Sequence, residues 1–211
     1  MNRKNAQRRF VFACLAPAVV LVVLFIFVPT VNVFRMSLYR MGGITNKKEF
    51  VGLYNFKTLM GDKNFLQAMQ NSITIIVMVM VCTIVLAILF AALLSRGKFK
   101  GKNFFRVIFY IPNILSIVVI AGIFGAIYDP SNGLLNTFLE AVHLDFLKHQ
   151  WMGDPNIVLY SVIFALVWQA IGYYMVMYMS SMAAIPEDLY EAASLDGATE
   201  IQIFFQVTLP L

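Results

Sequence analysis

The densest group of residues that could do chemistry lies in residues 183–207, where five acidic residues occur without a lysine or arginine. They are Glu187, Asp188, Glu191, Asp196 and Glu200. A surface with charge of one sign suits docking, because complementary charge on a partner steers association. A solvated acidic loop has the same composition, so both interpretations stay open at this point.

Residues for catalysis or metal binding are scarce. His143 and His149 lack zinc-ligand spacing, and Cys14 and Cys82 lie in apolar runs, as small buried hydrophobic residues do. The apolar segments contain no Asp, Glu, His or Lys for acid–base chemistry. No GxxxxGK[ST] stretch is present to hold the phosphates of ATP. We expect no enzymatic activity, and no cofactor or metal bound by this chain.

The acidic residues are expected on two short helices around a glycine, a segment called the elbow below (183–207). Pro186 suits a first helical position, and the acidic residues after it favour a helix N-terminus. Gly197 is suited to a left-handed helix end. Thr199 and Gln202 have capping-box spacing, so a second helix is expected to run to about Val207.

The composition indicates a membrane protein. Hydrophobic residues make up 60% of the chain and charged residues 13%, against roughly 25% charged in soluble domains. Four segments are long enough to cross a bilayer core of about 30 Å, and they lack the period-2 alternation of strands. These predicted spans are residues 10–34, 72–94, 107–128 and 157–182. The first is expected to be retained, since a signal peptide has a shorter apolar core and a cleavage site. The predicted fold class is an all-α polytopic membrane protein.

Lysine and arginine counts predict the orientation. The arm 1–9 holds four and the loop 95–106 holds five, whereas the loop 129–156 holds only Lys148. Basic residues concentrate in cytoplasmic loops, so the N-terminal arm, the 95–106 loop and the elbow are expected in the cytoplasm. Residues 35–71 are then an external loop, whose aromatic residues predict an interfacial segment. This topology accounts for the net charge of +5 without nucleic acid.

The elbow sequence resembles the EAA signature of binding-protein-dependent ABC importer permeases. The matching residues are Glu191-Ala192-Ala193, Asp196-Gly197-Ala198 and Leu209-Pro210. Further elements, in the same order along the chain, are similar to the first-permease type of the carbohydrate (sugar) uptake subfamily. They are Leu15-Ala16-Pro17, FVGLYNF at 50–56, Gln70-Asn71-Ser72, Tyr110-Ile111-Pro112 and GLLN at 133–136.

The resemblance implies a type I importer permease in the plasma or inner membrane of a prokaryote. The implied partners are a cytoplasmic ABC ATPase dimer that binds ATP and Mg²⁺, a second permease subunit and an external solute-binding protein. In the elbow, Glu191 would contact the ATPase, Ala192 and Ala193 would allow close seating, and Gly197 would form the turn. Asp196, Ala198 and Pro210 belong to the same coupling motif.

The resemblance also implies two further spans, so residues 208–211 are expected to begin a truncated next span. The expected function is inward movement of a sugar or polyol. Two alternatives remain at this stage: a permease for a non-sugar solute, and a non-transporting scaffold that binds a cytosolic partner through the elbow.

A sugar site needs hydrogen-bonding groups and aromatic faces inside the membrane. Trp168, Gln169 and Tyr173 lie on one face of the predicted fourth span at helical spacing. Asn113 and Ser116 follow Pro112, which frees a backbone carbonyl in the third. These five residues are the candidate substrate path. The simpler explanation of the same residues is hydrogen bonding between helices together with an aromatic belt.

Overall fold

The structure is a computed structural model that describes residues 3–41, 48–96 and 101–211. It divides into two compact units, Met1–Met69 and Gln70–Leu211. Helices dominate both units, as the all-α prediction requires.

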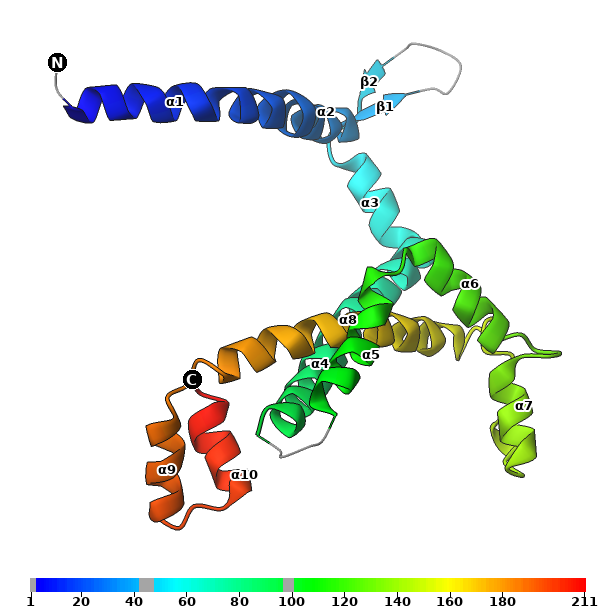
Figure 1. Cartoon of the computed structure of the whole chain (residues 1–211). Coiled ribbons are helices and arrows are strands. Elements are labelled where there is room, and N and C mark those ends of the chain that lie inside the picture. Colours follow the sequence, from blue (N-terminus) through cyan, green and yellow to red (C-terminus); the bar gives the residue numbers. More distant parts are fainter. Residues whose placement is uncertain (1–2, 42–47, 97–100) are drawn as a thin grey trace. The chain divides into compact units, whose positions relative to one another are not determined.

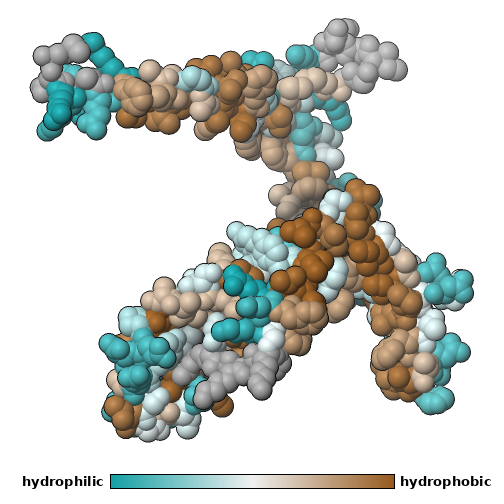
Figure 2. Space-filling model, viewed as in Figure 1, coloured by the Kyte–Doolittle hydropathy of each residue, from teal (hydrophilic) through white to brown (hydrophobic). Residues whose placement is uncertain are grey.

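The first unit begins with a long apolar helix. It comprises α1 (Arg3–Val22), a π-helical turn (Val23–Phe27) and α2 (Val28–Ser37). Beyond its hydrophilic N-terminal end, apolar side chains cover most of its visible face (Figure 2), and no residue of its most apolar window is buried within the protein. A helix with this much exposed apolar surface needs lipid or another protein around it. The helix starts at Arg3, so it includes most of the arm expected at 1–9.

A hairpin and a short helix follow. Strand β1 (Tyr39–Met41) pairs antiparallel with β2 (Lys48–Phe50), and helix α3 (Tyr54–Gly61) comes next. The amide Nδ2 of Asn55 donates hydrogen bonds to the carbonyl oxygens of Ser37, at 2.8 Å, and Tyr39, at 3.1 Å. The FVGLYNF segment therefore fastens α3 to the end of α2. Its asparagine has a structural role.

Three helices form the main core of the second unit: α4 (Lys63–Arg96), which enters this unit at Gln70, α5 (Lys102–Ile114) and α8 (Val158–Met182) (Figure 1). Ala87 and Ala91 of α4 are fully buried with Ile171 and Met175 of α8. Small residues at such a face let helix backbones approach closely, which is the usual packing mode between helices in membranes. A ring contact between Phe90 of α4 and Phe109 of α5, with centroids 4.8 Å apart, adds α5 to this core.

The third predicted span is not one continuous helix. Helix α5 ends at Ile114 and α6 (Ile117–Ile127) starts at a bend of 104°. Pro112 cannot donate a backbone hydrogen bond near the end of α5, Leu115 is extended, and Ser116 caps α6 by accepting a bond from the Val119 N–H. The segment 107–128 is therefore built from two helices, and its crossing of the membrane as one span stays a prediction. By length and composition the described residues contain three spanning helices, or four if the bent pair is one span.

A second core joins α6 to the start of α8 and to the segment between them, which holds α7 (Leu134–Ala141) and a 3₁₀ turn (Asp145–Leu147). Tyr128 stacks on Trp151, with centroids 6.1 Å apart, and its hydroxyl donates to the carbonyl oxygen of Ser161 at 3.2 Å. The indole Nε1 of Trp151 donates to Oδ1 of Asn136 at 2.8 Å. The polar groups of the buried Tyr128 and the half-buried Trp151 thus both have partners, as the stability of such a cluster requires.

Candidate functional site

The elbow is a folded helix–turn–helix. Helix α9 (Glu187–Leu195) is followed by α10 (Glu200–Ile203), which continues as a π-helical turn (Phe204–Thr208). Pro186 is the N-cap residue, so α9 begins at Glu187, one residue later than the prediction that put Pro186 at the first helical position. The capping box is confirmed: the Gln202 side chain accepts from the Thr199 N–H at 2.8 Å, and Thr199 Oγ1 accepts from the Gln202 N–H at 3.4 Å.

Gly197 ends α9 in the predicted left-handed conformation, with φ of +80°. Its N–H donates to the carbonyl of Ser194 at 3.1 Å, and the N–H of Ala198 donates to the carbonyl of Ala193 at 3.0 Å. This pair of bonds is a Schellman motif, which satisfies two carbonyls that the helix end leaves open. The glycine of the EAA signature is therefore explained by backbone geometry.

Side chains hold the two helices of the elbow together. The hydroxyl of Tyr190 on α9 lies 3.3 Å from Oγ1 of Thr208, at hydrogen-bond distance. Ile203 is 2% exposed and Thr208 is 5% exposed, so the inner face of the elbow is packed. A packed pair of helices can move as one body, which is what a mechanical connection requires.

The outer face of the elbow is acidic and apolar. Glu191, Ala192, Asp196 and the more distal Pro210 are exposed, whereas Ala193 and Ala198 are half-buried at the Schellman turn. Leu195 is 89% exposed beside these acids. A protein contact combines an apolar centre with a polar rim, and Leu195 with these carboxylates supplies groups of both kinds. Of the two alanines predicted to seat a partner, Ala192 is the more accessible.

The residues of the candidate substrate path do not share one cavity. Trp168 is half-buried, with its ring centroid 5.4 Å from that of Phe124, and it lines an aromatic cavity of about 520 Å³ together with Tyr160 and Phe164. Gln169 is half-buried and lies outside that lining. Tyr173 is 47% exposed and packs against Tyr174. Gly172, between them, is buried against α5.

Asn113 and Ser116 lie at the bend between α5 and α6. Asn113 is half-buried, and Ser116 is exposed with its hydroxyl engaged as the cap of α6 at 3.4 Å. Cap formation explains this serine without a substrate. The five residues therefore stay a prediction, with local structural roles evident for Ser116 and Trp168.

Sequence reasoning missed a polar cavity in the segment between α6 and α8. It has a volume of about 480 Å³ and is lined by Asn136, Thr137, Glu140, Lys148 and His149, among others. Lys148 Nζ lies 2.8 Å from Asp145 and 2.7 Å from Glu140. Its hydrogen bond to Asp145, and to a smaller extent the one to Glu140, raises the pKa of Lys148 above its ordinary value. Glu140 and Lys148 are eight residues apart and meet only because the chain turns back after α7. No sequence motif predicts this contact. No cluster suited to a metal ion occurs among the described residues.

Known proteins resemble the chain along nearly its whole length. It is 39% identical over 207 residues to the Bacillus subtilis protein named "Probable ABC transporter permease protein YurN", with 98% of this chain and 70% of that protein covered. It is 32% identical to the multiple sugar-binding transport system permease protein MsmF of Streptococcus mutans, covering 99% of this chain and 70% of that protein. A crystal structure of a bacterial ABC transporter involved in alginate import matches with a TM-score of 0.83 at 26% identity, covering 98% of this chain and 69% of that chain.

The family model for the binding-protein-dependent transport system inner membrane component matches residues 83–211. The matched residues include the buried core between α4, α5 and α8 and the whole elbow. The chain therefore belongs to the family of binding-protein-dependent transport system inner membrane components, the permeases of ABC transporters.

Proposed function

We propose that the chain is a permease subunit that moves a sugar or a related polyol inward. The observation that carries this proposal is the packed elbow with its exposed acidic face, in a chain whose relatives include sugar permeases. Other similar proteins are named for diacetylchitobiose uptake in Streptomyces coelicolor and for trehalose/maltose transport in Thermococcus litoralis.

The elbow would couple transport to ATP hydrolysis on a separate ATPase dimer. Glu191, Asp196 and the exposed Leu195 would enter a groove of that partner, with Ala192 allowing close approach. The Schellman turn and the Tyr190–Thr208 contact would keep α9 and α10 in a fixed relation. Movement of the groove would then shift both helices together and tilt the adjoining α8.

The remaining partners follow from the same proposal. A second permease subunit would complete the transport path as a heterodimer, and an external binding protein would deliver the solute. The elbow and the N-terminus would face the cytoplasm, since residues 95–106 are rich in basic residues and residues 129–156 are not. ATP and Mg²⁺ would bind to the ATPase alone.

Disulfide crosslinking tests the coupling role. In a background with Cys14→Ser and Cys82→Ser, Ala192→Cys is expected to form a disulfide with a cysteine in the groove of the ATPase. Its yield should change when ATP and Mg²⁺ are added. Ser131→Cys, on the turn after α6, is the matched control and should give no adduct. Absence of an ATPase adduct from Ala192→Cys under every nucleotide condition would refute the coupling role.

Uptake tests the substrate class. Membranes that contain the chain with its ATPase, second permease and binding protein should accumulate a radiolabelled oligosaccharide only with ATP. If Gln169 and Tyr173 contact the sugar, Gln169→Ala and Tyr173→Ala should raise the KM for uptake. Unchanged kinetics in both variants would remove these residues from the substrate path and leave the coupling role untouched.

A further inference from the structure

We propose that a cavity at the base of the elbow, together with a groove along α5, binds one anionic phospholipid of the bilayer. The proposal goes beyond transport and coupling: it adds a lipid ligand to the protein. The site lies wholly within the second unit and is formed by α4, α5, α8 and α9.

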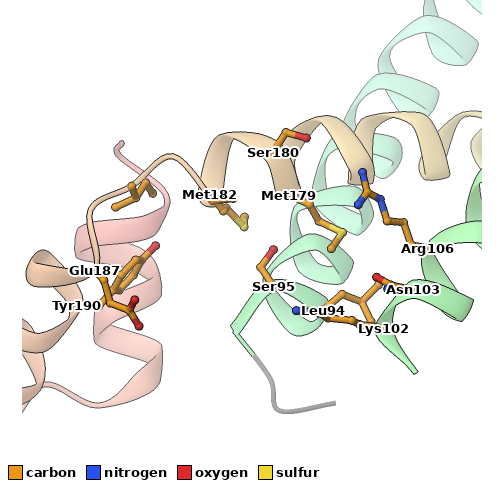
Figure 3. A pocket seen from close by; sticks show the side chains of 12 residues that line it. Leu94, Ser95, Lys102, Asn103, Arg106, Met179, Ser180, Met182, Glu187 and Tyr190 are labelled. Atoms are coloured by element: carbon orange, nitrogen blue, oxygen red, sulfur yellow. The ribbon is translucent and has the colours of Figure 1, made fainter. Parts of the chain in front are cut away.

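The cavity would hold the headgroup. It has a volume of about 660 Å³ and lies where the end of α4, the start of α5 and the end of α8 meet the first turn of α9. Lys102, Asn103 and Arg106 line it from α5, and Ser95 lines it from α4 (Figure 3). The set supplies two cations and two neutral hydrogen-bonding groups. These are the groups that bind a phosphate and its polar substituent.

The charge of the cavity favours an anion. Lys102 and Arg106 form no ion pair with any residue in the described part of the chain. Glu187 is the one carboxylate in the lining and leaves an excess of one positive charge. Its position on α9 makes it a suitable acceptor for a headgroup hydroxyl, as in phosphatidylglycerol.

The groove would hold an acyl chain. It shares Asn103 and Arg106 with the cavity and continues along α5 past Val107, Tyr110, Ile111 and Ile114, with Val176 of α8 beside them. The α5 residues recur every three or four positions and so form one helical face. From Arg106 to Ile114 the face extends roughly 12 Å at 1.5 Å per residue. The volume of the groove is about 530 Å³.

The combination selects a lipid over other ligands. A free phosphate would use the cavity and leave the apolar groove unfilled. An apolar helix would fill the groove and leave two cations without a partner. A phospholipid with a negative headgroup satisfies both parts, and basic pockets between membrane helices are known to bind such headgroups. Assignment to the cytoplasmic leaflet rests on the orientation proposed above, but the site itself does not.

Native mass spectrometry tests the proposal. The purified chain is placed in nanodiscs with equal amounts of phosphatidylglycerol and phosphatidylcholine, and the lipids retained after release are counted. One phosphatidylglycerol should remain in clear excess. Arg106→Gln and Lys102→Gln should each weaken its retention about fivefold, the loss expected for one cation near a membrane surface. Arg106→Lys should restore most of it.

Two further variants separate a lipid site from general charge. Lys63→Gln removes an exposed cation that lines neither part of the site. This variant should retain as much phosphatidylglycerol as the unmodified chain does. Ile111→Trp fills the groove without changing charge and should also release the lipid. Circular dichroism of each variant checks that it keeps its helical fold. The preference of the unmodified chain for phosphatidylglycerol over phosphatidylcholine tests the proposal without any variant.

The outcomes are decisive in either direction. Equal retention of the two lipids by the unmodified chain would overturn the proposal, as would equal losses in Arg106→Gln and Lys63→Gln. Full retention in Ile111→Trp, together with displacement by millimolar inorganic phosphate, would show a free-anion site. None of these three results would affect crosslinking of the elbow to an ATPase.

Discussion

At the scale of single residues, Gly172 determines how closely α8 approaches α5. A methyl group built on its Cα would lie 1.7 Å from the carbonyl oxygen of Phe109 and 2.9 Å from the Cα of Tyr110. Both are backbone atoms, so rotation of a side chain cannot relieve the overlap. Although Gly172 lies between Gln169 and Tyr173 of the candidate substrate path, the structure shows it packed against the backbone of α5.

Replacing Gly172 with alanine should therefore separate the two helices. We expect a loss in the free energy of unfolding of about 1–3 kcal/mol, the usual cost of overpacking, measured by thermal unfolding in detergent. Gly125→Ala in α6 is the control, because a methyl group there meets no atom within 4 Å. If both variants unfolded alike, the close contact would not limit stability.

Ser116 allows a capping role to be distinguished from a substrate role. Removing its hydroxyl in Ser116→Ala leaves the Val119 N–H without its cap, which should cost about 0.5–1 kcal/mol, at the low end for caps, since the bond is 3.4 Å long. Amide exchange at Val119 should accelerate while uptake KM stays constant. Ser116→Asp, which can also cap, should restore slow exchange. A rise in KM in the alanine variant, with exchange unchanged, would favour the substrate role.

At the scale of elements, local signals predicted some structures well and others not at all. The elbow was predicted closely, because its cap, its left-handed glycine and its acidic first turn are all encoded by neighbouring residues. The break after α5 was missed, although Pro112 was noted. Proline alone kinks many helices only slightly, and here the change in direction also depends on the extended Leu115 and the new cap at Ser116.

The turn of the elbow provides a direct test of rigidity. Gly197→Ala forces a side chain into φ of +80°, which should cost about 1–2 kcal/mol and loosen the Schellman bonds. We expect lower crosslinking between Ala192→Cys and the ATPase, and lower uptake at the same expression level.

Gly197→Asn is the matched variant, because asparagine tolerates the left-handed region better than alanine does. It should recover much of the crosslinking. Equal crosslinking in the alanine variant and the unmodified chain would show that coupling does not depend on this turn.

At the scale of the whole molecule, composition and run length predicted the membrane class and the approximate positions of the apolar helices. They could not locate a substrate site, since that depends on which helix faces converge. Trp168 and Tyr173 share a helix yet differ in surroundings: one joins the aromatic core and the other is 47% exposed. The cavity of Lys102 and Arg106 was likewise hidden, because in the sequence these residues served only to predict orientation.

The orientation of the chain is the remaining prediction at this scale. Single cysteines are introduced at Asn132 and Asp196, both exposed, in the background without Cys14 and Cys82. An impermeant maleimide should label Asn132→Cys on intact cells and Asp196→Cys only after permeabilisation, because the basic residues of 95–106 hold that side in the cytoplasm. The opposite pattern would place the elbow outside, away from ATP, and the coupling proposal would fail with it.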